Sequence, residues 1–250
     1  MGALDARVAL VTGGGRGIGR AISELLAAEG AAVAVNYRRD RASADETVAA
    51  IRAAGGQASA YAASVDDADA DAAMVDAVIA DYGFVDLLVC NAGIASRGLA
   101  VADTEPSELV RVVATHALGP HHLCRLVLPS MRTRERGDIV MVSSVATTFM
   151  GANGAPYNMG KAALEALALT LAKEERRHGI HVNVVAPGWV NTPMTANLPQ
   201  EVRDRALQES ALGRLGEPDD VAQIVWFLAS PLAGHVTGQI IRVDGGQLIG

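Results

Sequence analysis

The chain has 250 residues, of which 50% are hydrophobic, 4% are aromatic and 20% are charged. This composition excludes a disordered chain, which needs low hydrophobicity and high charge, and it suits one well-buried aliphatic core. The formal net charge of −7 argues against a nucleic-acid partner, because binding to a phosphate backbone needs a positive field. The sequence has no signal peptide and no apolar stretch of bilayer length, so we expect a cytoplasmic protein without a membrane partner.

Short apolar runs alternate with helix-length patterns along the whole chain. Strands are predicted at residues 7–12, 32–37, 86–90, 138–143 and 181–186, with weaker candidates at 57–61 and 239–243. Their nearly continuous Val, Ile and Leu residues are typical of parallel strands buried on both faces. Helices are expected between them, at residues 19–29, 43–54, 68–81, 104–132, 155–178 and 218–230.

This alternation predicts the α/β class. We expect a single-domain Rossmann fold over residues 1–250, with a doubly wound parallel sheet of about seven strands and helices on both faces. No linker, repeat or low-complexity tract divides the sequence. The long helix at 104–132 contains Pro120, which could bend it, and Pro129, which could bend or end it.

A glycine-rich segment at residues 12–19 follows the first predicted strand. Gly13, Gly17 and Gly19 give the pattern T-G-x-x-x-G-x-G, and a predicted helix begins at once. Glycines permit positive φ angles and allow the backbone to approach a pyrophosphate at the positive end of a helix. A tight turn alone would need no ligand, but the place of this turn after the first strand of a βαβ unit favours a dinucleotide.

The end of the second strand predicts which dinucleotide binds. An NAD site needs an acid there for the ribose 2′-hydroxyl, whereas an NADP site needs cations for the 2′-phosphate. The chain has Tyr37, Arg38 and Arg39, with no carboxylate before Asp40. Arg38 can grip a phosphate with its planar guanidinium, and Arg16 can add a second charge. These arginines could instead be solvated surface groups, but the missing acid favours NADP(H).

Further segments give the sequence a resemblance to the short-chain dehydrogenase/reductase family over essentially its whole length. The run Cys-Asn-Ala-Gly at residues 90–93 is similar to the N-N-A-G segment after the family's fourth strand, apart from its first position. Ser144 lies thirteen residues before Tyr157 (157 − 144), and Tyr157 and Lys161 form a Y-x-x-x-K element. Residues 187–192 resemble the segment that covers the nicotinamide, and residues 213–246 resemble the family's carboxy-terminal region.

Within the family, residues 192–214 and the run G-R-L-G-E-P at 213–218 are most similar to 3-oxoacyl-[acyl-carrier-protein] reductases. The resemblance implies that Ser144, Tyr157 and Lys161 are catalytic and that His116 stands at the position of a family asparagine. We expect cofactor contacts from Gly13, Gly15, Arg16, Gly17, Ile18, Gly19, Tyr37, Arg38, Arg39, Ser64, Val65, Asn91, Ala92, Gly93, Tyr157, Lys161, Pro187, Gly188, Val190 and Thr192.

The catalytic candidates suit hydride transfer to a carbonyl, whose oxygen becomes negative and then needs a proton. Tyr157 would donate this proton, and the charge of Lys161, one helical turn away, should lower the tyrosine pKa. Ser144 could donate a hydrogen bond to the substrate oxygen. The family resemblance gives the lysine a second role, which is to hold the nicotinamide ribose.

His116 departs from the family pattern. The family asparagine supports a water in the proton relay to the lysine. Histidine can hydrogen-bond a water or a backbone group, so His116 could replace the asparagine. Alternatively, His116 is only a packed helix residue and the relay is altered or slower.

We therefore expect NADPH-dependent reduction of a ketone to a secondary alcohol, with 3-oxoacyl thioesters as a candidate substrate class. One alternative is an oxidative alcohol, sugar or steroid dehydrogenase of the same family. A more remote alternative is a catalytically impaired nucleotide-binding regulatory subunit. The substrate pocket is expected from loops at residues 95–99, 145–156 and 189–205.

Three expectations concern partners and metals. The family resemblance implies a homotetramer. Arg132, Arg134 and Arg136 are either a solvated surface or a docking patch for an acyl carrier protein. No metal site is expected, because the sequence has no Cys/His cluster and the adjacent His121 and His122 would point in different directions.

Overall fold

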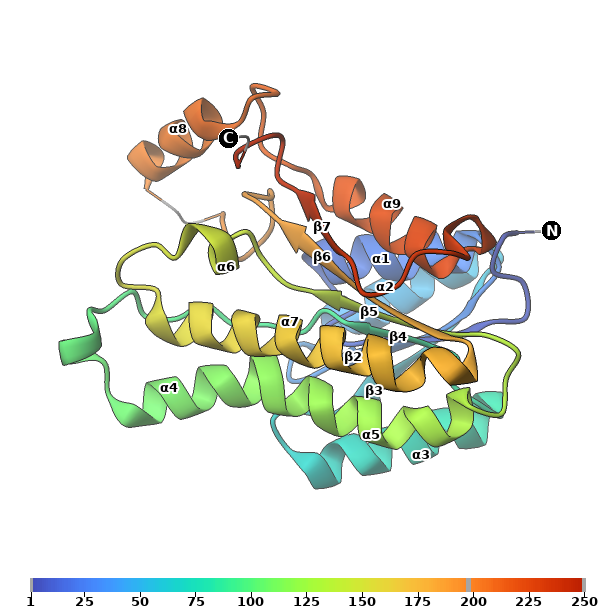
Figure 1. The fold of residues 1–250 in the computed structure, drawn as a ribbon. Coiled ribbons are helices and arrows are strands. Elements are labelled where there is room, and N and C mark those ends of the chain that lie inside the picture. Colours follow the sequence, from blue (N-terminus) through green and yellow to red (C-terminus); the bar gives the residue numbers. More distant parts are fainter. Residues whose placement is uncertain (1, 197–198, 249–250) are drawn as a thin grey trace.

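The structure is a computed structural model that describes residues 2–196 and 199–248, and within them seven parallel strands form one sheet (Figure 1). The strand order is β3-β2-β1-β4-β5-β6-β7. Both weaker strand candidates are present, as β3 and β7, so the predicted fold class is confirmed. The strands are β1 (Val8–Val11), β2 (Ala32–Tyr37), β3 (Gln57–Ala62), β4 (Leu87–Cys90), β5 (Gly137–Val142), β6 (Ile180–Pro187) and β7 (Ile240–Val243).

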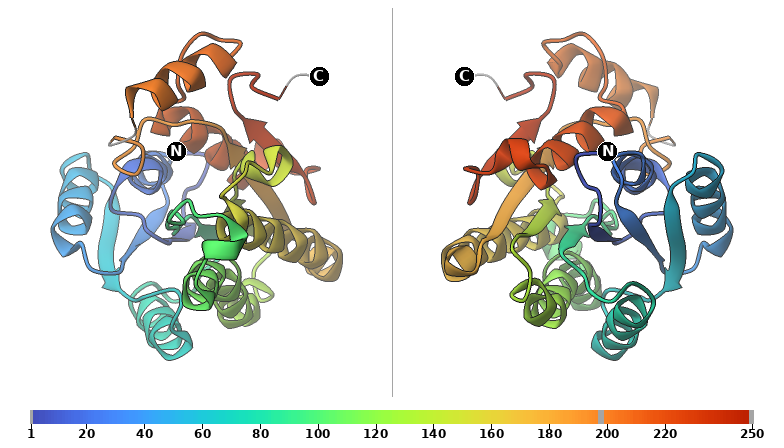
Figure 2. Two further views of the ribbon diagram at one scale, coloured as in Figure 1. Left: turned by 90° about the vertical axis from the view of Figure 1, so that its left-hand side faces the viewer. Right: turned by 90° about the vertical axis from the view of Figure 1, so that its right-hand side faces the viewer.

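Helices cover both faces of the sheet, as the end-on views in Figure 2 show. One face packs against α1 (Gly17–Ala28), α2 (Arg41–Ala53) and α9 (Pro218–Ala229). The other packs against α3 (Ala68–Tyr82), α5 (Gly119–Met131) and α7 (Ala155–Glu175). All of these helices except α5 lie where the sequence predicts them, with ends that differ by up to three residues; α5 is the second part of the helix predicted at 104–132.

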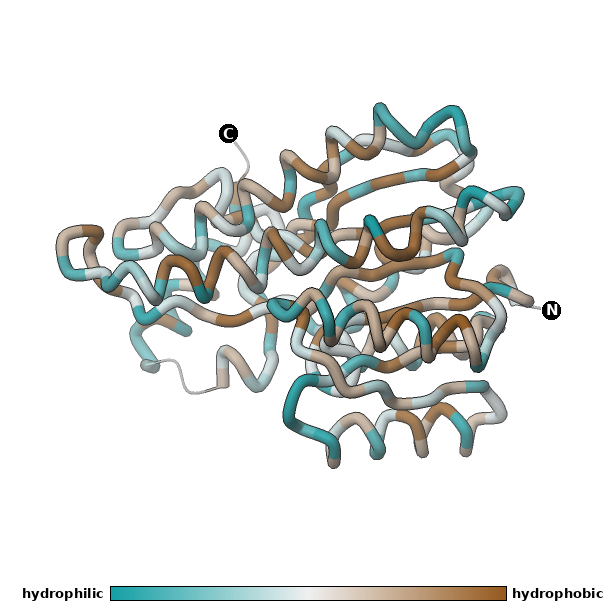
Figure 3. The backbone as a smooth tube through the Cα atoms, turned by 90° about the horizontal axis from the view of Figure 1, so that it is seen from below, coloured by the Kyte–Doolittle hydropathy of each residue, from teal (hydrophilic) through white to brown (hydrophobic). Residues whose placement is uncertain are grey.

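The core has two halves because side chains on a strand point alternately to opposite faces. All four residues of β1 are buried: Ala9 and Val11 pack under α1 and α9, whereas Val8 and Leu10 pack on the side of α3 and α5. Seen from below, hydrophobic stretches run along the strands and alternate with hydrophilic ones along the helices (Figure 3). This two-sided burial explains why the strand sequences are almost uniformly aliphatic.

The predicted helix at 104–132 is interrupted in the structure. It consists of α4 (Pro106–Val113), a π-helical turn (Ala114–Leu118) and α5. Pro120 has no N–H group with which to close the α-helical bond to His116, which accounts for a wider turn at this point. Pro129 lies inside α5 and does not end it.

Two helices lie in segments that the sequence predicts as loops. These are α6 (Ala146–Phe149), a single turn, and α8 (Gln200–Glu209). In α8 only Ala206 is buried, so its sequence has no apolar stripe that would reveal a helix. Side-chain pairs such as Arg205–Glu209, four residues apart, support it instead. Among the described residues no helix is both long and apolar enough to cross a membrane.

Candidate active site

A pocket of about 1410 Å³ opens at the carboxyl ends of the strands, where the strand order reverses between β1 and β4. It brings together every residue that the sequence predicts for catalysis or cofactor binding. These are Gly13, Gly15, Arg16, Gly17, Ile18, Gly19, Tyr37, Arg38, Arg39, Ser64, Val65, Asn91, Ala92, Gly93, His116, Ser144, Tyr157, Lys161, Pro187, Gly188, Val190 and Thr192.

The glycine loop between β1 and α1 has a conformation that other residues would not tolerate. Gly17 has a φ of +54°. A Cβ atom on Gly19 would lie 2.1 Å from the carbonyl oxygen of Gly13. The loop therefore packs closely on the start of α1, where a pyrophosphate could meet the helix N-terminus.

Hydrogen bonds between the ends of β1 and β4 hold the floor of the pocket. The Thr12 hydroxyl accepts from the backbone N–H groups of Asn91 and Ala92, both over 2.9 Å. In return, Nδ2 of Asn91 donates to the Thr12 carbonyl over 2.9 Å. The amide side chain of Asn91 thus braces the two strands where the crevice begins.

Asn36 braces the glycine loop against the outer strands, and the sequence did not single it out. Its Oδ1 accepts from the N–H of Gly13 over 3.1 Å, and its Nδ2 donates to the Ala63 carbonyl over 3.1 Å. The side chain is buried. A polar amide inside the apolar run A-V-A-V-N-Y was the signal that could have identified it.

The rim of the pocket beyond β2 is rich in arginine. Arg38 and Arg39 are exposed there, and neither forms an ion pair within the described residues. Asp40 is already engaged, because its side chain caps α2 at Ser43 and lies 3.6 Å from Arg16. The hydrogen bonds from Ser43, aided by Arg16, hold the pKa of Asp40 below its usual value. This rim fits a 2′-phosphate better than a bare ribose hydroxyl.

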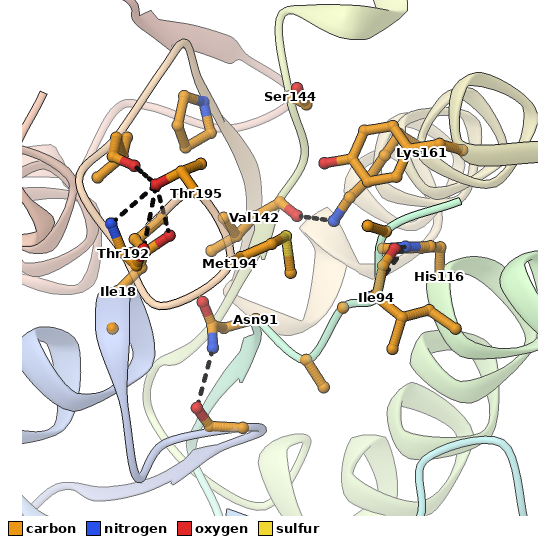
Figure 4. A pocket seen from close by; sticks show the side chains of 18 of the residues that line it. Ile18, Asn91, Ile94, His116, Val142, Ser144, Lys161, Thr192, Met194 and Thr195 are labelled. Carbon is orange, nitrogen blue, oxygen red and sulfur yellow. Dashed lines mark hydrogen bonds between the residues drawn. The ribbon is translucent and has the colours of Figure 1, made fainter. Parts of the chain in front are cut away.

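Tyr157 and Lys161 lie one turn apart at the start of α7. Nζ of Lys161 donates to the Val142 carbonyl at the end of β5 over 2.7 Å (Figure 4). Burial lowers the pKa of Lys161 to about 8, although the nearby Cys90 and Glu165 oppose that shift. The ammonium group is therefore held at a fixed place beside the strand end.

The expectation that Lys161 lowers the tyrosine pKa is not met in the structure. Burial raises the pKa of Tyr157, and only the Ser144 hydroxyl opposes this rise. The reason is geometric: Nζ of Lys161 is bound to Val142 and lies 5.9 Å from the centroid of the tyrosine ring. Ser144 itself accepts a hydrogen bond from the N–H of Ala146 over 3.2 Å.

His116 lies in the π-helical turn, behind Tyr157. Its Nε2 is 2.8 Å from the carbonyl oxygen of Ile94 (Figure 4). The ring fits because its neighbours are glycines: a Cβ atom on Gly93 or on Gly160 would approach atoms of His116 to 2.9 Å. Burial, together with the charge of Lys161, lowers the pKa of His116 to about 3, so the imidazole is neutral at physiological pH.

Two further side chains, which were not predicted, hold segments at or next to the pocket wall. Thr195 donates to the Val190 carbonyl over 2.7 Å and accepts from the N–H of Thr192 over 3.0 Å, which fixes the turn after β6. Glu108, which is buried on α4, accepts from the N–H of Arg97 over 3.0 Å and so anchors the segment after β4.

The basic cluster at the end of α5 lies away from the pocket. It precedes β5, whereas Ser144 follows β5. The two therefore lie at opposite ends of the strands, the cluster at the amino end and the pocket at the carboxyl end. Arg132 pairs with Glu175, and Arg136 pairs with Asp138. Arg134 stacks on the Phe84 ring at 3.9 Å. The described residues contain no cluster of His, Cys, Asp and Glu that could hold a metal ion.

Comparisons with known proteins agree with this geometry. A family model described as enoyl-(acyl carrier protein) reductase matches residues 13–247. A 3-oxoacyl-[acyl-carrier-protein] reductase from Thermotoga maritima is 37% identical over 246 residues, which are 98% of this chain and 99% of the relative. One from Synechocystis is 38% identical over 250 residues, which are 100% of both chains.

Solved structures agree as well. A short-chain dehydrogenase from Burkholderia cenocepacia in complex with NADP superposes with a TM-score of 0.94 at 33% identity. The match covers 99% of this chain and 100% of that one. The chain belongs to the short-chain dehydrogenase/reductase family. This membership confirms the predicted family and its oxidoreductase class.

As a member of the short-chain dehydrogenase/reductase family, the protein has the family's Ser, Tyr and Lys side chains within one pocket. The ring of His116, which the sequence resemblance places at the position of a family asparagine, contacts the Ile94 backbone. In the segment that resembles the family's N-N-A-G, the first position is Cys90. This residue is buried at the end of β4 and contributes no polar side chain to the pocket wall.

Proposed function

We propose that the protein reduces a ketone to a secondary alcohol with NADPH. The observation that carries this proposal is the convergence of Ser144, Tyr157 and Lys161 in a pocket whose rim carries Arg38 and Arg39. The first three suit proton donation to a carbonyl oxygen, and the two arginines suit the 2′-phosphate that distinguishes NADPH from NADH.

Different residues around the pocket would bind different parts of NADPH. The glycine loop would hold the pyrophosphate, Arg38 and Arg39 the 2′-phosphate, and Tyr157 and Lys161 the nicotinamide ribose. The cofactor supplies the hydride when bound. The glycine loop at the N-terminus of α1, together with the two exposed arginines, fits this group.

The side chains then handle the developing charge and the proton. Ser144 donates a hydrogen bond to the carbonyl oxygen as negative charge builds on it. Tyr157 transfers its phenolic proton to that oxygen, which yields the alcohol and leaves a phenolate. The ammonium of Lys161 stabilises the phenolate once it leaves the Val142 carbonyl and turns toward the phenol. A proton from solvent then restores the tyrosine.

We propose 3-oxoacyl thioesters as the substrate class. Similarity to 3-oxoacyl-[acyl-carrier-protein] reductases supports this, and so does the pocket mouth. Phe149 and Met194 line the pocket and are both more than half exposed. Such an apolar mouth suits an acyl chain, because contact with the chain removes apolar surface from water.

The two alternative functions have less support. The oxidative dehydrogenase would use the same residues in reverse, but the arginine-rich rim favours NADP(H), which cells use mainly for reduction. The impaired regulatory subunit is disfavoured because Ser144, Tyr157 and Lys161 are all present in the pocket.

We propose an acyl carrier protein as the partner and a homotetramer as the assembly. Exposed apolar side chains on the long helices support the tetramer: Val110 and Leu118 are 66% and 51% exposed, and Leu169 on α7 is also exposed. The basic cluster of Arg132, Arg134 and Arg136 lies at the opposite end of the strands from the pocket of its own chain. A carrier protein docked on this cluster would therefore serve the pocket of a neighbouring chain.

A ketone panel that includes an acetoacetyl thioester, assayed with NADPH and with NADH, tests the proposed function. We expect turnover with NADPH, and faster turnover of the thioester than of simple ketones. Turnover of alcohols alone would favour the oxidative alternative, and cofactor binding without any turnover would favour the regulatory subunit.

A further inference from the structure

Glu165 lies one helical turn beyond Lys161 on α7 and accepts two hydrogen bonds from the segment that contains Ser144. Its Oε1 accepts from the Ser143 hydroxyl over 2.6 Å and from the Thr147 hydroxyl over 2.8 Å. These two residues flank Ser144 on either side. One carboxylate oxygen thus links the turn after β5 to the helix that carries Tyr157 and Lys161.

Other contacts of the same turn hold its backbone: the N–H of Ser143, on one side of Ser144, donates to the Val185 carbonyl of β6 over 2.7 Å. The Thr147 hydroxyl also lies 2.9 Å from the Ser144 carbonyl oxygen, and the N–H of Ala146 donates to the Ser144 hydroxyl. On the other side, the N–H of Val145 donates to the Pro187 carbonyl over 3.0 Å. The backbone is therefore tied to β6, but Glu165 supplies the direct side-chain tie between this turn and α7.

Glu165 also acts on Lys161 through its charge. Burial disfavours the charged ammonium, and the negative charge of Glu165 is one of two influences that oppose this effect. The other comes from Cys90 at the end of β4. From the long helix, the neutral His116 faces the same lysine. Glu165 is the only carboxylate among these influences on Lys161 in the described part of the chain.

We propose that Glu165 is a positioning residue that sets Ser144 opposite Tyr157 by tying the turn after β5 to α7, and that its carboxylate, one helical turn from Lys161, acts on the buried ammonium through its charge. The inference rests on the proposed function for its catalytic consequence. Glu165 touches neither substrate nor cofactor in this proposal, because it does not line the main pocket. It lies on the far side of the turn, beside a smaller cavity that includes Thr147 and Arg242.

Two variants separate the roles of geometry and charge. Glu165→Gln keeps an oxygen that can accept from both hydroxyls but removes the charge, whereas Glu165→Ala removes both. Glu174→Gln is the matched control, because Glu174 is an exposed carboxylate on the same helix. Thermal unfolding of each variant checks that it folds.

The first measurement is the titration of Lys161 without cofactor or substrate, by NMR of protein labelled at the lysine ε-carbon. The chain has only two lysines, Lys161 and Lys173, so the two signals are easily assigned by a Lys173→Arg variant. We expect Glu165→Gln to move the Lys161 titration to lower pH and Glu174→Gln to leave it in place. An unchanged Lys161 titration in Glu165→Gln would overturn the role of the charge.

The second measurement is steady-state ketone reduction over a range of pH. Glu165→Ala should lower kcat about tenfold or more with little change in KM for NADPH, because a displaced Ser144 harms the chemical step. Glu165→Gln should keep most of kcat at neutral pH and lose activity at a lower alkaline pH than the parent. If Glu165→Ala folds and matches the Glu174→Gln control, the positioning role is wrong. Absence of NADPH-dependent reduction in the parent would instead refute the proposed function and leave the lysine titration as the test.

Discussion

The imidazole ring of His116 lies edge-on against the phenol ring of Tyr157, with 5.1 Å between the ring centroids and 78° between the ring planes. Because the pKa of His116 falls to about 3, the ring stays neutral at any pH at which the enzyme would work. His116 therefore supports Tyr157 as an uncharged neighbour whose Nε2 is occupied by Ile94. A role in which His116 gains and loses a charge during proton transfer does not fit this environment.

Replacement of His116 tests this interpretation. His116→Ala should leave a cavity between Gly93 and Gly160, lower the free energy of unfolding by about 2 kcal/mol or more, and lower kcat about tenfold by loosening Tyr157. His116→Asn should retain more of the stability and more of kcat than His116→Ala, because its amide can still reach a backbone carbonyl. Urea unfolding and steady-state rates measure the two effects. A His116→Ala variant that matches the parent rate at every pH would remove His116 from the site altogether.

Removal of the phenolic hydroxyl tests the proton donor. Tyr157→Phe keeps the ring beside His116 but cannot donate a proton, so kcat should fall about 10²–10⁴-fold. Binding of NADPH, followed by fluorescence titration, should change little, because the glycine loop and the arginine rim are unaffected. A variant that keeps full turnover would show that another group supplies the proton.

Charge reversal at the rim tests the choice of cofactor. Arg38→Asp should weaken NADPH binding by about 10- to 100-fold, since a hydrogen bond to a charged group contributes about 1.5–3 kcal/mol, and it should narrow or invert the preference over NADH. Arg41→Asp is the matched control, because Arg41 is exposed at the start of α2 and does not line the pocket. Values of kcat/KM for both cofactors provide the comparison. A preference that is unchanged in Arg38→Asp would contradict the assignment.

Asp71 offers a prediction about stability. This side chain is fully buried on α3, and neither of its oxygens has a hydrogen-bond partner among the described residues. Burial, with Asp67 and Asp66 nearby, raises its pKa to about 7. The unfolded carboxyl ionises near pH 4. The free energy of unfolding should therefore fall as the pH rises from about 4 to about 7.

Asp71→Val should remove this pH dependence and raise the free energy of unfolding by about 1–3 kcal/mol at pH 8. The control is Asp76→Val, because Asp76 is an exposed aspartate on the same helix. Urea denaturation at pH 5 and pH 8 measures the free energy of unfolding of the parent and of both variants. Equal stability of Asp71→Val and the parent at pH 8 would mean that the carboxylate has found solvent or a partner.

The sequence carried enough information to predict the sheet, because parallel strands buried on both faces leave an aliphatic pattern that is hard to mistake. It also identified many of the pocket residues, because a pattern such as Tyr157 and Lys161 places two side chains on one helical face. The sequence could not predict contacts between segments that are distant along the chain. The tie between Glu165 and Ser143 depends on how α7 packs beside β5, and the polar sequence of α8 gives no sign of a helix.

The wide turn at residues 114–118 makes the pocket sensitive to chain length as well as to side-chain identity. Removing one residue there would restore ordinary α-helical pitch. It would then rotate α4 by roughly 100° relative to α5 and shift it by about 1.5 Å. Glu108 would swing away from the Arg97 backbone, and His116 from Ile94. A single-codon deletion that alters no other residue would thus dismantle one wall of the site, so homologous chains should tolerate substitutions in this turn more readily than gaps.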